Sequence, residues 1–130
     1  MTTELTYLAA TLVLALVQIL LPAGARTMEF GIGWNAGARD QTPESHNPVV
    51  GRLERAQSNL YETLPPFIGA VLVAHVTGAE SALTLWGVAL YFWARVAYIP
   101  LYALGVPYIR SLVWLVSLAG LILILVALFI

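Results

Sequence analysis

Residues 55–76 read RAQSNLYETLPPFIGAVLVAHV, and this stretch decides the fold. From Leu64 onward it is nearly all apolar, as in the helices that cross a lipid bilayer. Its first half instead carries an arginine, an amide and a carboxylate, at Arg55, Asn59 and Glu62. A helix that enters lipid with such groups must direct them toward protein, water or a ligand.

The composition of the whole chain is that of an integral membrane protein. Of its 130 residues, 60% are hydrophobic and 10% are charged, and the mean hydropathy is +0.84. Soluble domains are usually about 25% charged. The net charge of −1 and the absence of lysine give no basis for nucleic-acid binding. The absence of cysteine excludes disulfides, thiolate metal sites and a cysteine nucleophile.

Four apolar stretches are long enough to cross the bilayer. They are about residues 5–21, which we expect Pro22 to close, 60–76, 83–103 and 112–130. Residues 23–47 form a long polar connection, and the other two connections are short. Short connections join antiparallel neighbours, so we predict a single domain over residues 1–130, an all-α integral membrane protein with an up-down four-helix transmembrane bundle. Asn47-Pro48 has the form of an N-cap followed by proline, so the second helix should begin near Pro48.

The arginines predict the orientation of these spans. They gather in and around the first and third connections, and the second connection has none. By the positive-inside rule, the first and third connections are predicted to be cytoplasmic and both termini to lie on the opposite side. The flank MTTELTY contains an acid and no basic residue, so we do not interpret the first span as a signal peptide.

Polar residues form one face on each of two predicted helices. At about 100° per residue, the second helix brings four of them into an arc of about 80°. These are Arg52, Arg55, Asn59 and Glu62. On the third helix Tyr91, Arg95, Tyr98 and Tyr102 share a face in the same way. Pro65 and Pro66 should bend the second helix beside its polar face, because they remove two helical hydrogen bonds.

Two interpretations of these faces stay open from the residues alone. A charge at mid-membrane costs about 2.5–3.5 kcal/mol, so Arg95 needs a partner, and Glu62 is the candidate. Arg55, Glu62 and Arg95 would then form a buried salt-bridge network. The arginines outnumber the carboxylate, however, and arginine forks bind carboxylates bidentately. The alternative is therefore a binding site for a small zwitterionic peptide.

The stretch RLERAQSNLYETLPPF resembles the second-helix signature of the MAPEG family, the membrane-associated proteins in eicosanoid and glutathione metabolism. The signature is carried by Glu54, Arg55, Asn59, Glu62 and Pro65. The third-helix stretch ARVAYIPLY is similar to the family as well, and so are the four spans with a long first connection. We interpret the chain as a bacterial-type member of this family.

The resemblance implies a homotrimer that binds glutathione between protomers, near the cytoplasmic face. The residues implied to hold this co-substrate are Arg55, Gln57, Asn59, Glu62, Arg95, Tyr98 and Tyr102, with Gln57 acting from the adjoining protomer. Arg110 in GVPYIRS would be the catalytic residue that activates the thiol, although a positively charged anchor at the membrane surface is an alternative role. A lipophilic second substrate would enter from the surrounding membrane lipid.

Three functions compete for this sequence. The first is a glutathione transferase or peroxidase that acts on a lipophilic electrophile or hydroperoxide. The second is a non-catalytic membrane binding or scaffold protein with the MAPEG fold. The third, a transporter or channel, is the weakest, because the polar residues gather toward one face of the membrane and residues 118–130 are apolar. The long connection, with Trp34, Asn35, Arg39 and Asp40, either caps the bundle or covers the site as a lid.

Overall fold

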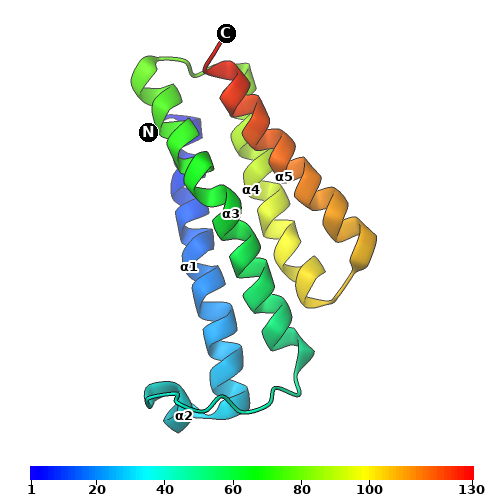
Figure 1. The fold of residues 1–130 in the computed structure, drawn as a ribbon. Coiled ribbons are helices and arrows are strands. Elements are labelled where there is room, and N and C mark those ends of the chain that lie inside the picture. Colours follow the sequence, from blue (N-terminus) through cyan, green and yellow to red (C-terminus); the bar gives the residue numbers. More distant parts are fainter.

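The structure is a computed structural model that describes residues 1–130, and it is entirely helical (Figure 1). Its helices are α1 (Thr3–Phe30), α2 (Ile32–Ala36), α3 (Pro48–Thr77), α4 (Ala82–Ala103) and α5 (Pro107–Ala127). All of them except α2 are long and apolar enough to cross a membrane. The predicted all-α membrane fold with four spanning helices is therefore confirmed.

The four long helices run alternately up and down. Both chain termini lie at one end of the bundle, and α2 lies at the other (Figure 1). The start of α3 and the α4–α5 connection point toward that second end, which we call the α2 end. Contacts are most extensive between α4 and α5, and α1 packs mainly on α3.

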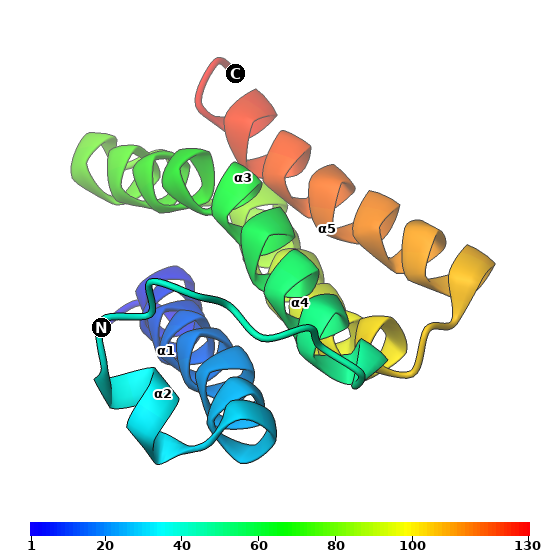
Figure 2. The same ribbon diagram turned by 60° about the horizontal axis from the view of Figure 1, so that its bottom comes forward.

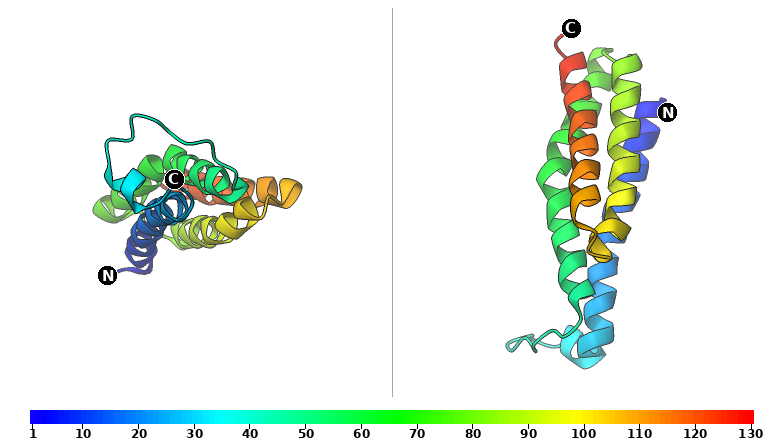
Figure 3. Two further views of the ribbon diagram at one scale, coloured as in Figure 1. Left: turned by 90° about the horizontal axis from the view of Figure 1, so that it is seen from below. Right: turned by 90° about the vertical axis from the view of Figure 1, so that its right-hand side faces the viewer.

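The helices differ in length, and this leaves a step at the α2 end. With 28 and 30 residues, α1 and α3 are about 42 and 45 Å long at about 1.5 Å per residue. The 22 and 21 residues of α4 and α5 give about 33 and 32 Å, close to the hydrocarbon thickness of about 30 Å. Figures 1 and 3 show α1 and α3 continuing past the α4–α5 connection.

The expectation that Pro22 closes the first helix is wrong, because α1 continues through it to Phe30. Proline removes one helical hydrogen bond and bends a helix, but it need not end one when the bundle supports both sides. Pro22 is buried in the bundle, and most of the residues after it, AGARTMEF, favour helix. The polar connection expected over 23–47 is therefore helical up to Phe30, and α2 makes a further short turn within it.

Helix α3 begins where the sequence predicts. The side chain of Asn47 accepts a hydrogen bond from the backbone N–H of Val49, and Pro48 occupies the first turn. The helix also runs through Pro65 and Pro66. Figure 2 shows that α3 changes direction about half way along its length, as two missing helical hydrogen bonds would cause.

Two contacts fix how α4 sits against its neighbours. The rings of Phe67 on α3 and Tyr91 on α4 stack at 3.9 Å between centroids, and the Tyr91 hydroxyl lies 2.8 Å from that of Thr63. On the other side of α4, Gly87 faces Gly120 of α5, and a Cβ on Gly87 would lie only 2.7 Å from the carbonyl oxygen of Gly120. Such small-residue contacts bring membrane helices close together.

Candidate functional site

Three arginines gather at the α2 end, where α3 begins, α4 ends and α5 begins. They line a pocket of about 250 Å³, here called the arginine pocket. Its walls are Arg52, Arg55, Tyr102, Gly105, Pro107 and Arg110. No carboxylate lines this pocket, and none of its arginines forms an ion pair within the chain. The pocket therefore has an excess of positive charge that suits an anionic ligand.

The ring of Tyr102 is the platform of the arginine pocket. The guanidinium carbon of Arg110 lies 4.6 Å from the centre of this ring, and that of Arg55 lies 5.8 Å from it. A cation near an aromatic face is attracted by the charge distribution of the ring. Tyr102 thus holds together two like charges that come from different helices.

Arg52 is placed by the α4–α5 connection. Its Nη1 donates a 3.3 Å hydrogen bond to the carbonyl oxygen of Ala103, in the last turn of α4. The guanidinium also packs on Gly105, whose φ of 71° is a left-handed conformation that favours glycine. A Cβ at Gly105 would lie 2.9 Å from the Arg52 Cζ, so a side chain there would displace the guanidinium.

A second polar layer lies one turn deeper, around Arg95. This residue is only 1% exposed, and its Nη1 donates a 2.8 Å hydrogen bond to Oδ1 of Asn59. Its guanidinium carbon lies 4.7 Å from the ring centre of Tyr98, and the Tyr98 ring meets that of Tyr102 edge-on at 5.5 Å. The Nε and Nη2 atoms of Arg95 are buried without a hydrogen-bond partner. The aromatic contacts connect this layer to the arginine pocket.

The family profile that matches this sequence is that of the MAPEG family, over residues 7–130. The chain belongs to the MAPEG family. The family includes glutathione transferases and peroxidases, generally uses glutathione, and its members are usually trimers. Comparison with curated proteins and comparison with solved structures give no match.

Most of the site residues that the MAPEG resemblance implies come together in space. Arg55, Tyr102 and Arg110 meet in the arginine pocket, and Asn59, Arg95 and Tyr98 meet in the layer below it. Arg52 completes the pocket, although the signature does not include it. Helical periodicity had already placed Arg52 on the same polar face as Arg55, three residues earlier.

The expected pairing of Glu62 with Arg95 is wrong. Glu62 is exposed and forms no salt bridge, and Arg95 bonds to Asn59 instead. The contact between Thr63 and Tyr91 sets the register of the antiparallel helices α3 and α4. Four residues along each helix from that contact, Asn59 stands level with Arg95, so the amide and not the carboxylate meets the guanidinium.

Gln57 lies outside both polar layers of its own protomer. Its Nε2 donates a 3.2 Å hydrogen bond to the hydroxyl of Tyr61, one turn along α3. At about 100° per residue, Gln57 points about 160° away from Arg55. Gln57 therefore does not line the arginine pocket of its own chain.

A larger polar pocket of about 490 Å³ shares Arg52 and Arg55 with the arginine pocket. Its floor holds an ion pair between Arg26 of α1 and Glu54 of α3, with an N–O distance of 2.9 Å. One wall is the end of the long connection, and Glu29 holds this segment in place. The carboxylate of Glu29 accepts hydrogen bonds from Ser45 Oγ and from the backbone N–H groups of His46 and Asn47.

The remainder of the long connection caps α1. Trp34 packs edge-on against Phe30 and donates a hydrogen bond from Nε1 to the carbonyl oxygen of Gln41. Arg39 bonds to Asn35 and lies over the Trp34 ring. Of the two expected roles for this connection, these contacts favour the cap.

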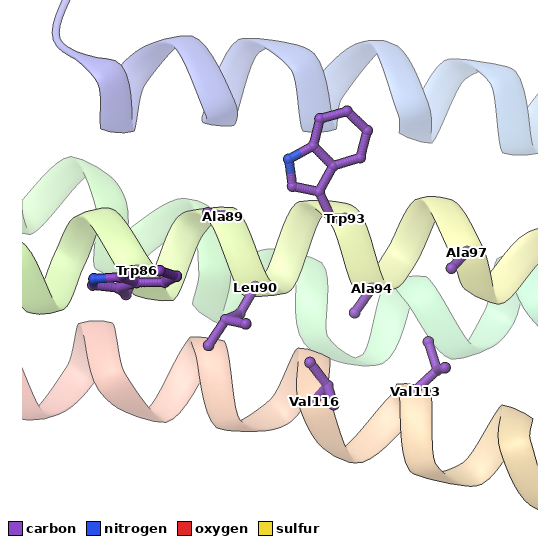
Figure 4. Close-up of a pocket in the computed structure, with 8 residues that line it drawn as sticks. All are labelled: Trp86, Ala89, Leu90, Trp93, Ala94, Ala97, Val113 and Val116. Atoms are coloured by element: carbon purple, nitrogen blue, oxygen red, sulfur yellow. The ribbon is translucent and has the colours of Figure 1, made fainter.

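An apolar pocket of about 270 Å³ lies between α4 and α5, on the side of this helix pair that faces away from α3 (Figure 4). Its lining residues are Trp86, Ala89, Leu90, Trp93, Ala94, Ala97, Val113 and Val116. None of these side chains is charged or can transfer a proton, and the indole N–H groups of the two tryptophans are the only polar groups among them. The candidate functional site of this MAPEG protein is therefore the arginine pocket with the Arg95 layer.

Proposed function

We propose that this protein binds glutathione at the arginine pocket and uses it as co-substrate, as a glutathione transferase or peroxidase acting on a lipophilic electrophile or hydroperoxide. The observation that carries the proposal is the set of three arginines without an internal counter-ion, around Tyr102. Glutathione has two carboxylates and one ammonium group. Arginine forks match carboxylates geometrically, and charge-assisted hydrogen bonds are the strong ones.

The polar groups around the pocket fit the rest of that peptide. Glu62 is exposed and unpaired on α3, two turns from Arg55, so its carboxylate is free to accept an ammonium group. Asn59 keeps its side-chain N–H groups available, because only its Oδ1 is used by Arg95. Arg52 and Arg55 would bind the carboxylates, and the Tyr102 ring would support the chain between them.

The chemistry would come from the bound peptide, and the protein would steer it. Glutathione would supply a thiolate that displaces the leaving group of an electrophile, or two molecules that reduce a hydroperoxide to an alcohol and water while forming a disulfide. A positive charge next to a thiol favours the thiolate, whose ordinary pKa is near 8.5. Arg110 is the candidate for this role, because it lines the pocket from the first turn of α5.

The size of the arginine pocket supports a site that neighbouring protomers complete. Ligand pockets usually measure about 300–1,000 Å³, and one protomer supplies about 250 Å³. We propose a homotrimer in which Gln57 of one protomer approaches the ligand of the next. We also propose that the α2 end faces the cytoplasm, because Arg52, Arg55 and Arg110 lie there.

The experiment that tests binding is thermal unfolding of the detergent-purified protein with and without glutathione. A ligand at about ten times its Kd stabilises the folded state by about 1.4 kcal/mol. We expect this stabilisation in the wild type and in Arg39→Ala, whose side chain bonds only within the long connection. We expect none in Arg55→Ala. A wild-type protein that millimolar glutathione does not stabilise would overturn the proposal.

One observation favours a second candidate, a membrane protein that binds glutathione without catalysis. Arg110 lies against Tyr102 in the same pocket as Arg52 and Arg55, where it can serve as a third carboxylate ligand. A wild-type protein that binds glutathione but converts neither an electrophile nor a hydroperoxide would support this candidate; if the wild type is active, Arg110→Ala distinguishes the two roles of Arg110. Loss of thiol activation lowers kcat and leaves the glutathione affinity nearly unchanged, whereas loss of a carboxylate ligand weakens binding.

A further inference from the structure

Helix α1 carries one buried side chain whose acceptor has no partner, at Gln18. The residue is 3% exposed, and its Oε1 has no hydrogen-bond partner. Pro22 stands four residues later and has no N–H, so the backbone carbonyl of Gln18 also lacks its usual helical donor. Two acceptors of one residue are therefore buried in an apolar bundle without their normal bonds, which is costly.

The complementary donors are on α4. Arg95 is 1% exposed and has two buried nitrogens, Nε and Nη2, without a partner. Asn59 accepts a hydrogen bond from Nη1 of Arg95 only, and the Tyr98 ring covers one face of the guanidinium. Unpartnered acceptors on α1 thus coexist with unpartnered donors on α4, and these two helices are in contact.

The helical geometry turns Gln18 toward α4. Glu4 on α1 accepts a 3.0 Å hydrogen bond from Thr84 of α4, and Tyr7 accepts a 3.1 Å hydrogen bond from Trp93 of α4. At about 100° per residue, Gln18 falls between Glu4 and Tyr7 around the axis of α1. The α4-facing side of α1 therefore includes Gln18.

The same contact puts Arg95 on the side of α4 that faces α1, at a level near that of Gln18. Around α4, Arg95 is only about 20° from Thr84, which meets α1 through Glu4. Helices α1 and α4 run in the same direction (Figure 1). Counted from the Glu4–Thr84 contact, Gln18 lies about 21 Å along α1 and Arg95 about 16.5 Å along α4, a difference in level of about 4.5 Å; the Tyr7–Trp93 contact joins two long side chains and fixes the relative level of the helices less closely. A long arginine side chain and one water molecule can span such an offset.

We infer that Gln18 and Arg95 share one water molecule buried between α1 and α4, which makes Gln18 a positioning residue for Arg95. Buried waters typically make about three hydrogen bonds to groups that otherwise lack partners. Here the partners are the two acceptors of Gln18 and the free edge of the Arg95 guanidinium. Arg95 is then held by Asn59, by the Tyr98 ring and by this water. The role in binding rests on the proposed glutathione site.

The test of the contact is a double-mutant cycle on stability. Gln18→Leu, Arg95→Met and the double variant are compared by thermal unfolding without glutathione. We expect Gln18→Leu to lower Tm when Arg95 is present and to have no such effect in the Arg95→Met background, because coupled residues are not additive. Equal Tm changes of Gln18→Leu in the two backgrounds would overturn the inference. This arm does not depend on glutathione.

The test of the positioning role is the glutathione affinity of the same variant. We expect Gln18→Leu to weaken glutathione binding by about tenfold, the scale of one hydrogen bond to a charged group. The control is Thr11→Val, which also removes a buried polar group from α1, one that bonds only to the Tyr7 carbonyl of its own helix. Thr11→Val should bind as the wild type does.

The outcomes separate the two proposals. Unchanged affinity in Gln18→Leu, or an equal loss in Thr11→Val, would overturn the positioning role. Coupling in the stability cycle together with no glutathione binding by the wild type would overturn the proposed function and the role of Gln18 in it. The coupling itself would then stand as a structural contact.

Discussion

Replacing Gly105 by alanine tests how the arginine pocket is built, because this residue contacts Arg52. Gly105 has φ = 71°, where an L-residue costs about 1–2 kcal/mol. Its new Cβ would lie 2.9, 3.0 and 3.2 Å from Cζ, Nη2 and Nη1 of Arg52. The guanidinium must shift, and we expect it to turn away from the pocket and lose its hydrogen bond to the Ala103 carbonyl, worth about 1 kcal/mol in a half-buried position.

Gly78 provides a matched control for this substitution. It has φ = 70°, and no atom lies within 4 Å of its Cβ position. Gly78→Ala therefore carries the backbone strain alone, whereas Gly105→Ala carries the strain and displaces Arg52. We expect both to lower the free energy of unfolding by about 1–2 kcal/mol, and Gly105→Ala by about 1 kcal/mol more.

The decisive assay is a glutathione titration of both variants by calorimetry, beside their unfolding curves in detergent. Loss of one charge-assisted contact, about 1.5–3 kcal/mol, should raise the Kd of Gly105→Ala by about tenfold or more. Gly78→Ala should keep the wild-type Kd. Equal affinities in the two variants would refute the argument that Gly105 keeps Arg52 in the binding pocket.

Two further predictions concern the packing of the helices and the response of stability to pH. Gly87→Ala should lower the free energy of unfolding by about 1–3 kcal/mol, because its Cβ would meet the α5 backbone. Gly69→Ala is the control: it has open space around it and should raise the free energy of unfolding by up to about 1 kcal/mol. Denaturant unfolding that finds the two variants equally stable would contradict the close α4–α5 contact. The Thr2 hydroxyl donates a 2.7 Å hydrogen bond that lowers the pKa of Glu80, so its contribution to stability is present above the unfolded-state pKa and is lost as the pH falls through the folded-state pKa. Between about pH 6 and pH 3, Tm should therefore fall more steeply in the wild type than in Glu80→Gln, and parallel curves would show that this bond is not formed.

The sequence was sufficient to predict features set by local chemistry. Asn47-Pro48 predicted the start of α3 because a cap depends on neighbouring residues alone. Helical periodicity predicted the polar face of α3 and the tyrosine face of α4. In the structure, Arg55 of the first face and Tyr102 of the second line the same pocket. These features need no knowledge of how the helices pack.

Features that depend on packing between helices could not be predicted in this way. The predicted pairing of Glu62 with Arg95 was wrong because the contact between Thr63 and Tyr91 sets the register of α3 against α4. Helical periodicity shows which residues share a face, but it does not show which residues of two helices lie at the same level. Pro22 was predicted to end the first helix because the sequence does not show that this residue is buried in the bundle, where its neighbours support a continuous helix. Gln18, a lone glutamine among aliphatic residues, gave no signal in the sequence, because the lack of partners for its Oε1 and for two nitrogens of Arg95 is visible only once the helices are packed.

The step between the long and short helices has a consequence for how two dissimilar molecules can meet. Because α4 and α5 are about as long as the hydrocarbon is thick while α1 and α3 continue about 10 Å further, we expect the α4–α5 connection to lie at the boundary between lipid and water. A charged peptide can reach Arg52 and Arg55 from the aqueous side without entering the bilayer, and an oily molecule can arrive at the same level without leaving it. Lipid phosphates crowd that same boundary, so the arginines must distinguish their ligand from the headgroups around them. Anionic lipids are then natural competitors, and the choice of detergent or lipid becomes part of any binding measurement.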